Sequence, residues 1–272
     1  MPRTDLRDKA VLLTGAAAGI GRACAVELAE RGARLLLADV DAEGLAETRA
    51  LLGERGRDAA CFAVDLGSLD EVDRLASEAL DHAGRIDVLY NNAGVMVASR
   101  ALDMEWSDYE HLANVNLWAP LRLTHHLLPA MLERGSGHIA VTASLNGLAT
   151  APGTGGYGLT KAGLIAWYEA LRAELRGRGV GVTVVCPGFV RTGLFERGRS
   201  RDPRFLERTR TAPAFVGLRP EKVARLSVRA IERGRPLRQL GAERASLWLK
   251  YLSIRAYDAY NGLLARYTLS HR

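Results

Sequence analysis

Tyr157 and Lys161 have the residue types and the spacing of an acid–base pair, within the segment SLNGLATAPGTGGYGLTK at 144–161. If the chain around them is helical, the two side chains lie one turn apart on the same face, so that an ammonium can sit beside a phenol. A tyrosine titrates near a pKa of ~10, and a nearby positive charge lowers that pKa by stabilising the phenolate. The pair could therefore exchange a proton with a substrate whose oxygen Ser144 holds. Tyr-x-x-x-Lys also fits a solvated helix face, so this interpretation depends on its context.

A glycine-rich turn early in the chain could bind a phosphate group. The apolar run at 10–15 ends in Thr-Gly, and the following AAAGIGRACAVELAERG has apolar positions at helical spacing as far as Gly32. Glycines between a strand and a helix let the backbone approach a pyrophosphate, whose charge is met by the amides and the dipole of the helix N-terminus. The residues assigned to this turn are Gly15, Gly19, Ile20 and Gly21.

Asp39 stands at the end of the second apolar run. A carboxylate at this place can accept hydrogen bonds from an adenosine ribose diol and repel a 2′-phosphate, which favours NAD over NADP. Arg22 is the one feature that favours a phosphate, and no second basic residue accompanies Asp39.

Polar residues also follow the next two apolar runs. Asp65 ends the third, and Asn91–Gly94 end the fourth, where Asn92 fits a simple turn as well as it fits a cofactor contact. Asn116 lies among apolar residues inside a predicted helix, which indicates either a cap for neighbouring backbone or a member of a polar relay.

Alternating strands and helices would bring these residues to one edge of a sheet. The pattern predicts strands over 10–15, 33–41, 58–65, 86–94, 137–144, 181–188 and 237–240, and helices over 16–32, 41–55, 69–83, 107–133, up to about 178 from Tyr157, and 220–233. This order indicates right-handed crossovers and an α/β fold with a doubly wound parallel sheet, the Rossmann fold. Ligands of such sheets bind at the carboxyl ends of the strands. We find no domain boundary, so residues 1–272 are expected to form a single domain.

The composition is that of a soluble globular protein, with 272 residues of which 48% are hydrophobic and 25% are charged. Neither a long uncharged apolar run nor a signal-peptide pattern is present, so secretion and membrane spanning are not expected. The cysteines Cys24, Cys61 and Cys186 lack metal-ligand spacing, which predicts reduced thiols, no metal site and a cytoplasmic location. The charge balance is +8 for residues 219–272, against a net charge of +6 for the whole chain. The basic character therefore belongs to the tail, and nucleic-acid binding is not expected.

Together these motifs resemble the short-chain dehydrogenase/reductase superfamily over about residues 8–235. The residues that carry the resemblance are Thr14–Gly21, Asp39, Asp65, Asn91–Gly94, Asn116, Ser144, Tyr157, Lys161 and Pro187-Gly188 with Thr192. The resemblance implies that Tyr157 exchanges the proton, Ser144 orients the substrate oxygen, and Lys161 lowers the tyrosine pKa and holds the nicotinamide ribose. It also implies that Asn116 positions a water linked to Lys161.

The same resemblance implies the cofactor contacts. Gly15, Gly19, Ile20 and Gly21 would line the pyrophosphate and Asp39 the adenosine ribose; Asp65 and Leu66 would meet adenine, Asn92, Ala93 and Gly94 the neighbouring ribose, and Pro187, Gly188, Val190 and Thr192 the carboxamide side.

Residues 242–272 depart from the family, many members of which end in a Val-Asp-Gly-Gly segment at a tetramer interface. Taken as one helix, this amphipathic extension carries an apolar stripe of Trp248, Leu249, Leu252, Ala256, Ala259, Tyr260, Leu263, Leu264 and Tyr267. We expect the helix to pack on the body or on a second subunit of a homodimer or homotetramer. The alternatives are peripheral contact with an anionic membrane surface and a lid over the substrate.

The expected substrate pocket is mostly apolar. Its wall comprises Val95, Met96, Val97, Leu145, Leu148 and a loop at 189–216 with Phe189, Leu194, Phe195, Phe205 and Phe215, while Arg191, Arg197 and Arg199 are expected to face solvent. The sequence therefore predicts an oxidoreductase that transfers a hydride between NAD(H) and a lipophilic secondary alcohol or ketone of steroid, retinoid or aryl type. The alternatives are an NADPH-dependent ketoreductase of 3-oxoacyl chains and a non-catalytic dinucleotide-sensing protein.

Overall fold

Seven strands form a parallel sheet in the computed structural model, which describes residues 3–194, 198–200, 217–241 and 245–268. In spatial order the strands are β3 (Ala60–Ala63), β2 (Arg34–Asp39), β1 (Ala10–Thr14), β4 (Val88–Asn91), β6 (Gly137–Thr142), β7 (Val180–Pro187) and β9 (Leu237–Leu240). All neighbours pair in parallel, and the order reverses direction between β1 and β4. The predicted doubly wound sheet and single domain are therefore confirmed.

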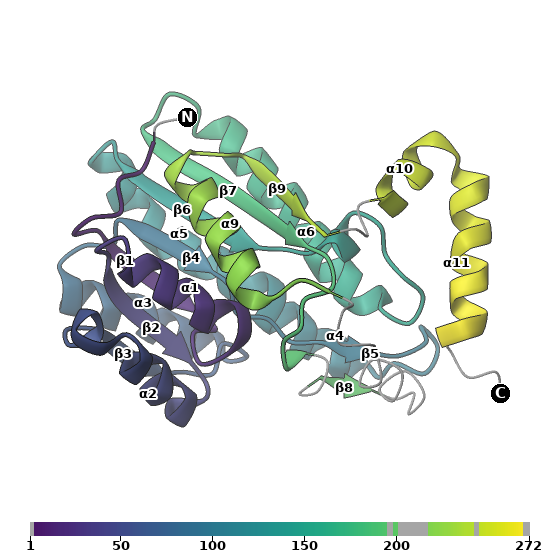
Figure 1. The fold of residues 1–272 in the computed structure, drawn as a ribbon, viewed down its shortest axis with the longest axis horizontal. Helices are drawn as coiled ribbons and strands as arrows, with labels where there is room; N and C mark the ends of the chain where they lie inside the picture. Colours follow the sequence, from purple (N-terminus) through teal and green to yellow (C-terminus); the bar gives the residue numbers. More distant parts are fainter. Residues whose placement is uncertain (1–2, 195–197, 201–216, 242–244, 269–272) are drawn as a thin grey trace.

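Helices cover both faces of the sheet because the strands are apolar on both sides (Figure 1). One face packs against α1 (Gly19–Ala29), α2 (Ala42–Leu51) and α9 (Pro220–Glu232). The other face packs against α3 (Leu69–Ala83), α5 (Ala119–Glu133) and α6 (Gly155–Glu174). The carboxyl ends of the strands are left open between these layers, which is where the predicted site residues lie.

The helix predicted over 107–133 has an interruption. It consists of α4 (Trp106–Ala113), a π-helical turn over Asn114–Trp118, and α5, which has Pro120 in its first turn. Pro120 lacks the N–H that a regular helix would use there, and the wider turn before it places Asn116 fully inside the protein.

Some short elements carry no periodic signal and were not expected. Strand β5 (Val97–Ala98) pairs with β8 (Arg199–Ser200), and single 3₁₀ turns occur at Gly53–Gly56 and Leu145–Gly147. Two residues are too few to show an alternating pattern, so only the fold reveals the second small sheet.

The C-terminal extension is two helices, α10 (Ala245–Leu252) and α11 (Ile254–Thr268), and the prediction of one continuous helix is wrong. The break is at Ser253, whose N–H donates to the Leu249 carbonyl at 2.9 Å while its hydroxyl accepts from the Ala256 N–H at 3.2 Å as a cap for α11. We call α10 and α11 the C-terminal arm. In Figure 1 it stands beyond the end of the sheet toward which the β9 arrow points.

The break also changes which residues of the C-terminal arm are buried. Leu247 and Tyr257 are buried, whereas Trp248, Leu252 and Leu263 from the predicted apolar stripe are 68%, 81% and 66% exposed. No helix in the described ranges has the length and apolarity needed to cross a membrane.

Candidate active site

A cavity of about 800 Å³ lies at the carboxyl ends of the strands and brings the predicted site residues together. Of the predicted set, Asn116 alone does not line it. The residues that do are Gly15, Gly19, Ile20, Gly21, Asp39, Asp65, Leu66, Asn92, Ala93, Gly94, Ser144, Tyr157, Lys161, Pro187, Gly188, Val190 and Thr192. No group of three or more His, Cys, Asp or Glu side chains that could bind a metal ion occurs among the residues that the structure describes.

The glycine turn between β1 and α1 has no room for side chains. Gly15 has φ +69°, and a Cβ there would lie 2.7 Å from the Ala93 Cα. A Cβ on Gly21 would lie 1.8 Å from the Gly15 carbonyl oxygen. The N-cap residue of α1, Ala18, makes no side-chain cap, and the first turn of that helix holds no acidic residue. The turn therefore presents bare backbone and a helix N-terminus to the cavity, which suits a phosphate group.

Asp39 is held at the end of β2 by backbone N–H groups. Its two carboxylate oxygens accept hydrogen bonds from Ala17 at 2.9 Å and from Asp41 at 3.2 Å, and the side chain lines the cavity. Arg22, the feature that favoured a phosphate, is engaged elsewhere. Its guanidinium donates to the Ala17 carbonyl and to Glu47 at 2.6 Å, and Arg22 does not line the cavity.

Tyr157 is almost completely buried, and burial raises its pKa to about 12 because the phenolate would lose its water. A hydrogen bond with Ser144 acts in the opposite direction and is the weaker effect. The pKa of Tyr157 therefore lies above its ordinary value because of burial, and the predicted lowering by Lys161 stays a prediction.

Lys161 is one turn beyond Tyr157 on α6, as the spacing predicts. Its ammonium lies 5.7 Å from the centre of the Tyr157 ring and donates to the Thr142 carbonyl at 3.0 Å. Burial lowers the lysine pKa to about 8. The ammonium is thus fixed beside the phenol by the end of β6, a partner that the sequence analysis did not identify.

Ser144 directly precedes a tightly hydrogen-bonded segment over residues 145–154, which we call the serine loop. The Ser144 hydroxyl accepts from the Asn146 N–H at 3.1 Å. The Asn146 side chain donates to Thr154 at 2.8 Å and accepts from the Ala151 N–H at 2.8 Å. Asn146 therefore holds both Ser144 and the segment that leads to Tyr157 in place. The sequence offered no signal for this role beyond the position of Asn146.

Asn116 holds the strand-end backbone in place. Its amide accepts from the Val95 N–H at 2.8 Å and donates to the Val95 carbonyl at 2.9 Å and to the Thr160 hydroxyl at 3.3 Å. Of the two interpretations that the sequence left open, these contacts match the bonding of neighbouring backbone. The relay to Lys161 stays a prediction.

Asn92 has a similar bridging position between strands. Its amide donates to the carbonyls of Thr14 and Gly15 at 3.1 and 3.3 Å and accepts from the Thr142 hydroxyl at 3.1 Å. It ties the glycine turn to β6 while lining the cavity. Its side chain therefore supports the site, and a contact with a cofactor stays a prediction.

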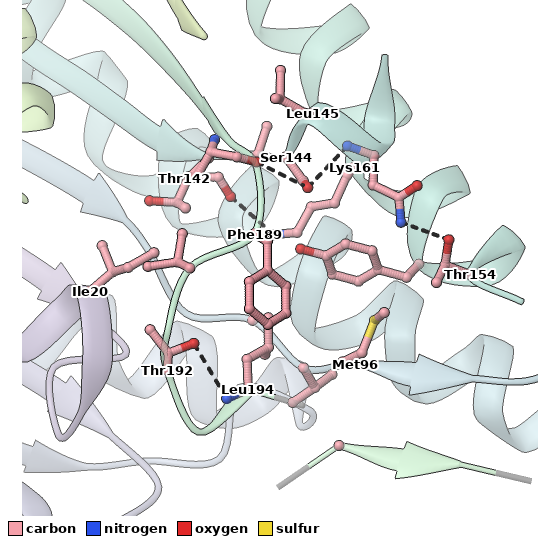
Figure 2. Close-up of a pocket in the computed structure, with 18 of the residues that line it drawn as sticks. Ile20, Met96, Thr142, Ser144, Leu145, Thr154, Lys161, Phe189, Thr192 and Leu194 are labelled. Atoms are coloured by element: carbon pink, nitrogen blue, oxygen red, sulfur yellow. Dashed lines mark hydrogen bonds between the residues drawn. The ribbon is translucent and has the colours of Figure 1, made fainter. Parts of the chain in front are cut away.

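Apolar side chains form the wall opposite the polar group. Figure 2 shows Phe189 between Thr142, Ser144 and Lys161 on one side and Met96 and Leu194 on the other. Of the other predicted wall residues, Val95 and Leu145 line the cavity. Val97 lies in strand β5 and Leu148 packs against the core, and neither lines the cavity. Phe195, Phe205, Phe215 and Arg197 lie outside the described residues. Arg191 and Arg199 are exposed.

The C-terminal arm completes the cavity with residues that the sequence analysis did not assign to the site. Ser246, Tyr257, Tyr260, Asn261 and Leu264 line it. The signal was present, because the last four of these recur at the spacing of one helix face. The predicted apolar stripe assumed one continuous helix. Because the helix is broken at Ser253, the stripe was centred on a face next to the one that lines the cavity.

Comparisons with known proteins agree with this geometry. The short chain dehydrogenase family matches residues 9–202. The ketoacyl reductase HetN of Nostoc sp. is 37% identical over 230 residues, covering 84% of this chain and 77% of that protein. The 1-deoxy-11-beta-hydroxypentalenate dehydrogenase of Streptomyces exfoliatus is 37% identical over 194 residues, covering 70% of each chain.

Solved structures give the same result. A short chain dehydrogenase/reductase from Burkholderia phymatum in complex with NAD superposes with a TM-score of 0.85 at 29% identity, covering 93% of this chain and 96% of that one. The match over most of the chain, together with the glycine turn and the Ser144, Tyr157 and Lys161 group, shows that this protein is an oxidoreductase of the short-chain dehydrogenase/reductase family.

Proposed function

We propose that this protein transfers a hydride between NAD(H) and a lipophilic secondary alcohol or its ketone, with Tyr157 as the general acid and base. One observation carries the proposal: Ser144, Tyr157 and Lys161 converge in a cavity whose other wall is apolar and whose far side is the glycine turn. A purely dinucleotide-sensing protein would need the turn but would have no use for the acid–base group.

The residues present fit a nicotinamide dinucleotide, which supplies the hydride acceptor or donor when bound. A Cβ at Gly15 or Gly21 would collide with Ala93 or with the Gly15 carbonyl, so glycine at both positions keeps the turn tight at the N-terminus of α1, where a pyrophosphate would bind. Asp39 is fixed by two backbone N–H groups. Arg22 is bound to the Ala17 carbonyl and to Glu47 and does not line the cavity, so it is not placed to meet a 2′-phosphate. This arrangement supports NAD over NADP.

The proton chemistry follows from burial. With a pKa of about 12, the Tyr157 phenol holds its proton at neutral pH and is ready to donate it to a ketone oxygen. Ser144 would hold that oxygen by a hydrogen bond. In the oxidative direction the phenolate must form, and the Lys161 ammonium, charged below a pKa of about 8, is the nearby group that stabilises it.

The apolar wall supports a lipophilic substrate. Phe189, Leu194 and Met96 offer dispersion contacts, and Lys161, at the catalytic end, is the one lysine or arginine among the described lining residues. A cavity of this kind provides no partner for a phosphate or carboxylate at its apolar end.

The predicted homo-oligomer and the predicted membrane contact stay predictions. Trp248 and Tyr251 are both strongly exposed, and either contact would cover these side chains.

A ketoreductase acting on 3-oxoacyl chains is the second candidate, favoured by the name of the Nostoc relative. Initial rates with NAD⁺ and NADP⁺ on lipophilic and polar secondary alcohols, and with NADH and NADPH on 3-oxoacyl thioesters, separate the two. Preferential use of NAD⁺ with lipophilic alcohols supports the first proposal. Activity confined to NADPH and thioesters would replace it with the second.

Replacement of Tyr157 by phenylalanine tests the acid–base assignment. We expect kcat to fall roughly 10²- to 10⁴-fold, the usual contribution of a positioned proton donor. The Kd for NAD should change by less than about twofold, because the ring remains and only a hydroxyl is lost. Tyr251→Phe, at a 74% exposed position of α10, is the matched control and should match the wild type. Retained activity in Tyr157→Phe would show that another group transfers the proton.

A further inference from the structure

One face of α11 is built into the cavity. Tyr257, Tyr260, Asn261 and Leu264 all line it, and each is three or four residues from another of them, so they share one helix face. Leu263, the neighbour of Leu264 in sequence, points away and is 66% exposed. The helix therefore presents a defined recognition face rather than a generally apolar surface.

The C-terminal arm is attached to the serine loop, which positions the proton-transfer residues. The Lys250 ammonium donates to the Leu148 carbonyl at 2.7 Å, and the Tyr257 hydroxyl donates to the Thr150 carbonyl at 3.1 Å. Lys250 also lies 5.9 Å from the centre of the Tyr257 ring, and Leu247 is buried against the core. These contacts fix α11 relative to the loop between Ser144 and Tyr157, so its face can discriminate between ligands.

Asn261 brings an unusual chemistry to this face. It is half-buried on the cavity wall, and its amide has no hydrogen-bond partner among the residues that the structure describes. An asparagine amide offers two donors and an acceptor. The neighbouring Leu264 is apolar, as are Phe189 and Leu194, which line the same cavity. A ligand that fills this part of the cavity can satisfy the amide only with an oxygen or nitrogen of its own.

We propose that α11 selects the substrate, with Leu264 packing on its apolar body and Asn261 hydrogen-bonding a second oxygen remote from the reacting carbon. This inference rests on the proposed function for the identity of the reacting group. The substrate class is then an elongated, largely hydrocarbon secondary alcohol or ketone that carries an additional hydroxyl or keto group at its far end.

Binding of a matched ligand pair tests this inference. The probes are a rigid polycyclic secondary alcohol and the same skeleton with a keto group at the opposite end, and their Kd values are measured by calorimetry in the presence of NAD⁺. Wild type should prefer the keto compound by about fivefold, the value of one neutral hydrogen bond. Asn261→Leu, which keeps the volume and removes the amide, should abolish this preference.

Leu264→Ala and Leu263→Ala form the second, structure-matched comparison. Leu264→Ala should weaken binding of both polycyclic ligands by about tenfold, because it removes buried methylenes from the wall. Leu263→Ala should leave both Kd values unchanged, since its side chain faces away from the cavity. Equal melting temperatures of the variants check that the arm still folds.

The outcomes separate this inference from the proposed function. If the wild type turns over no alcohol, yet the ligand preference and its loss in Asn261→Leu are observed, the proposed reaction is wrong and the recognition face stands. Equal affinity of the wild type for the two ligands, no binding of either, or equal effects of Leu263→Ala and Leu264→Ala would each overturn the inference, even with an active enzyme.

Discussion

Replacing His138 should change how the stability of this protein responds to acid. His138 begins the part of β6 that leads to Ser144, and its ring is fully buried. Nδ1 hydrogen-bonds the Thr4 hydroxyl at 3.1 Å and Nε2 the Thr183 hydroxyl at 2.9 Å. Neither partner carries a charge, and burial alone lowers the pKa of the imidazole from 6.5 to about 4.

The direction of the effect follows from proton uptake. Above pH 6.5 the ring is neutral in the folded and unfolded states and pH has no effect through it. Between pH 6.5 and 4 the imidazole of His138 binds a proton in the unfolded chain but stays neutral in the folded chain, so the folded state loses stability as the pH falls. The shift from 6.5 to about 4 corresponds to about 3 kcal/mol of free energy of unfolding, lost across this window.

Urea unfolding of the wild type and His138→Gln between pH 4 and pH 8 measures this contribution. Glutamine keeps one hydrogen bond and does not titrate, so the difference in free energy of unfolding should be constant above pH 6.5 and shift by about 3 kcal/mol in favour of the variant toward pH 4. His125→Gln, at an exposed position of α5, controls for loss of a surface imidazole. Parallel curves for wild type and His138→Gln over the whole range would refute the reasoning.

Further substitutions test the dinucleotide site and the core. Asp39→Ala should lower the preference for NAD over NADP in kcat/KM by about tenfold or more, because the repulsion of a 2′-phosphate is lost; an unchanged ratio would remove Asp39 from the role. Gly21→Ala should strongly lower the yield of folded protein or the Tm, since the new Cβ would lie 1.8 Å from the Gly15 oxygen. Gly53→Ala is the comparison: its Cβ would meet open space and only the left-handed φ is unfavourable, so the free energy of unfolding should fall by about 1 kcal/mol. Tyr168→Phe should cost about 1–3 kcal/mol in urea unfolding, as it removes a buried hydroxyl with three hydrogen bonds; a variant as stable as the wild type would contradict that assignment.

The fold was predictable because its signals are local. The run of Leu and Val in β1 and β2 is apolar on both faces, and the helix of α3 begins and ends at the predicted residues 69 and 83, between the Ser68 cap and the left-handed Gly84. Such patterns depend on a few neighbouring residues. The π-helical turn at Asn114–Trp118 was missed because a single wider turn within a helical stretch leaves the apolar periodicity on either side intact.

The site was predictable only where its residues stand at strand ends or at helical spacing. Gly15, Asp39 and Lys161 meet these conditions, and all line the cavity. The contribution of Asn261 depends on the break at Ser253, which rotates the recognition face relative to a continuous helix. A hydrophobic stripe constrains a helix face only when the helix is unbroken, so this part of the site required the three-dimensional structure.

The pKa of Tyr157 shows why these remote elements matter for the chemistry. A hydrogen bond with Ser144 favours the phenolate, but exclusion of water favours the phenol, and the second effect is the larger one in this structure. Water is excluded by the walls of the cavity, which include Tyr257 of the C-terminal arm as well as Phe189. The residues that enclose the site therefore set the protonation state in which Tyr157 meets the substrate. Local sequence motifs identify the acid–base pair, whereas the rise in the Tyr157 pKa comes from burial, which only the three-dimensional enclosure of the site produces.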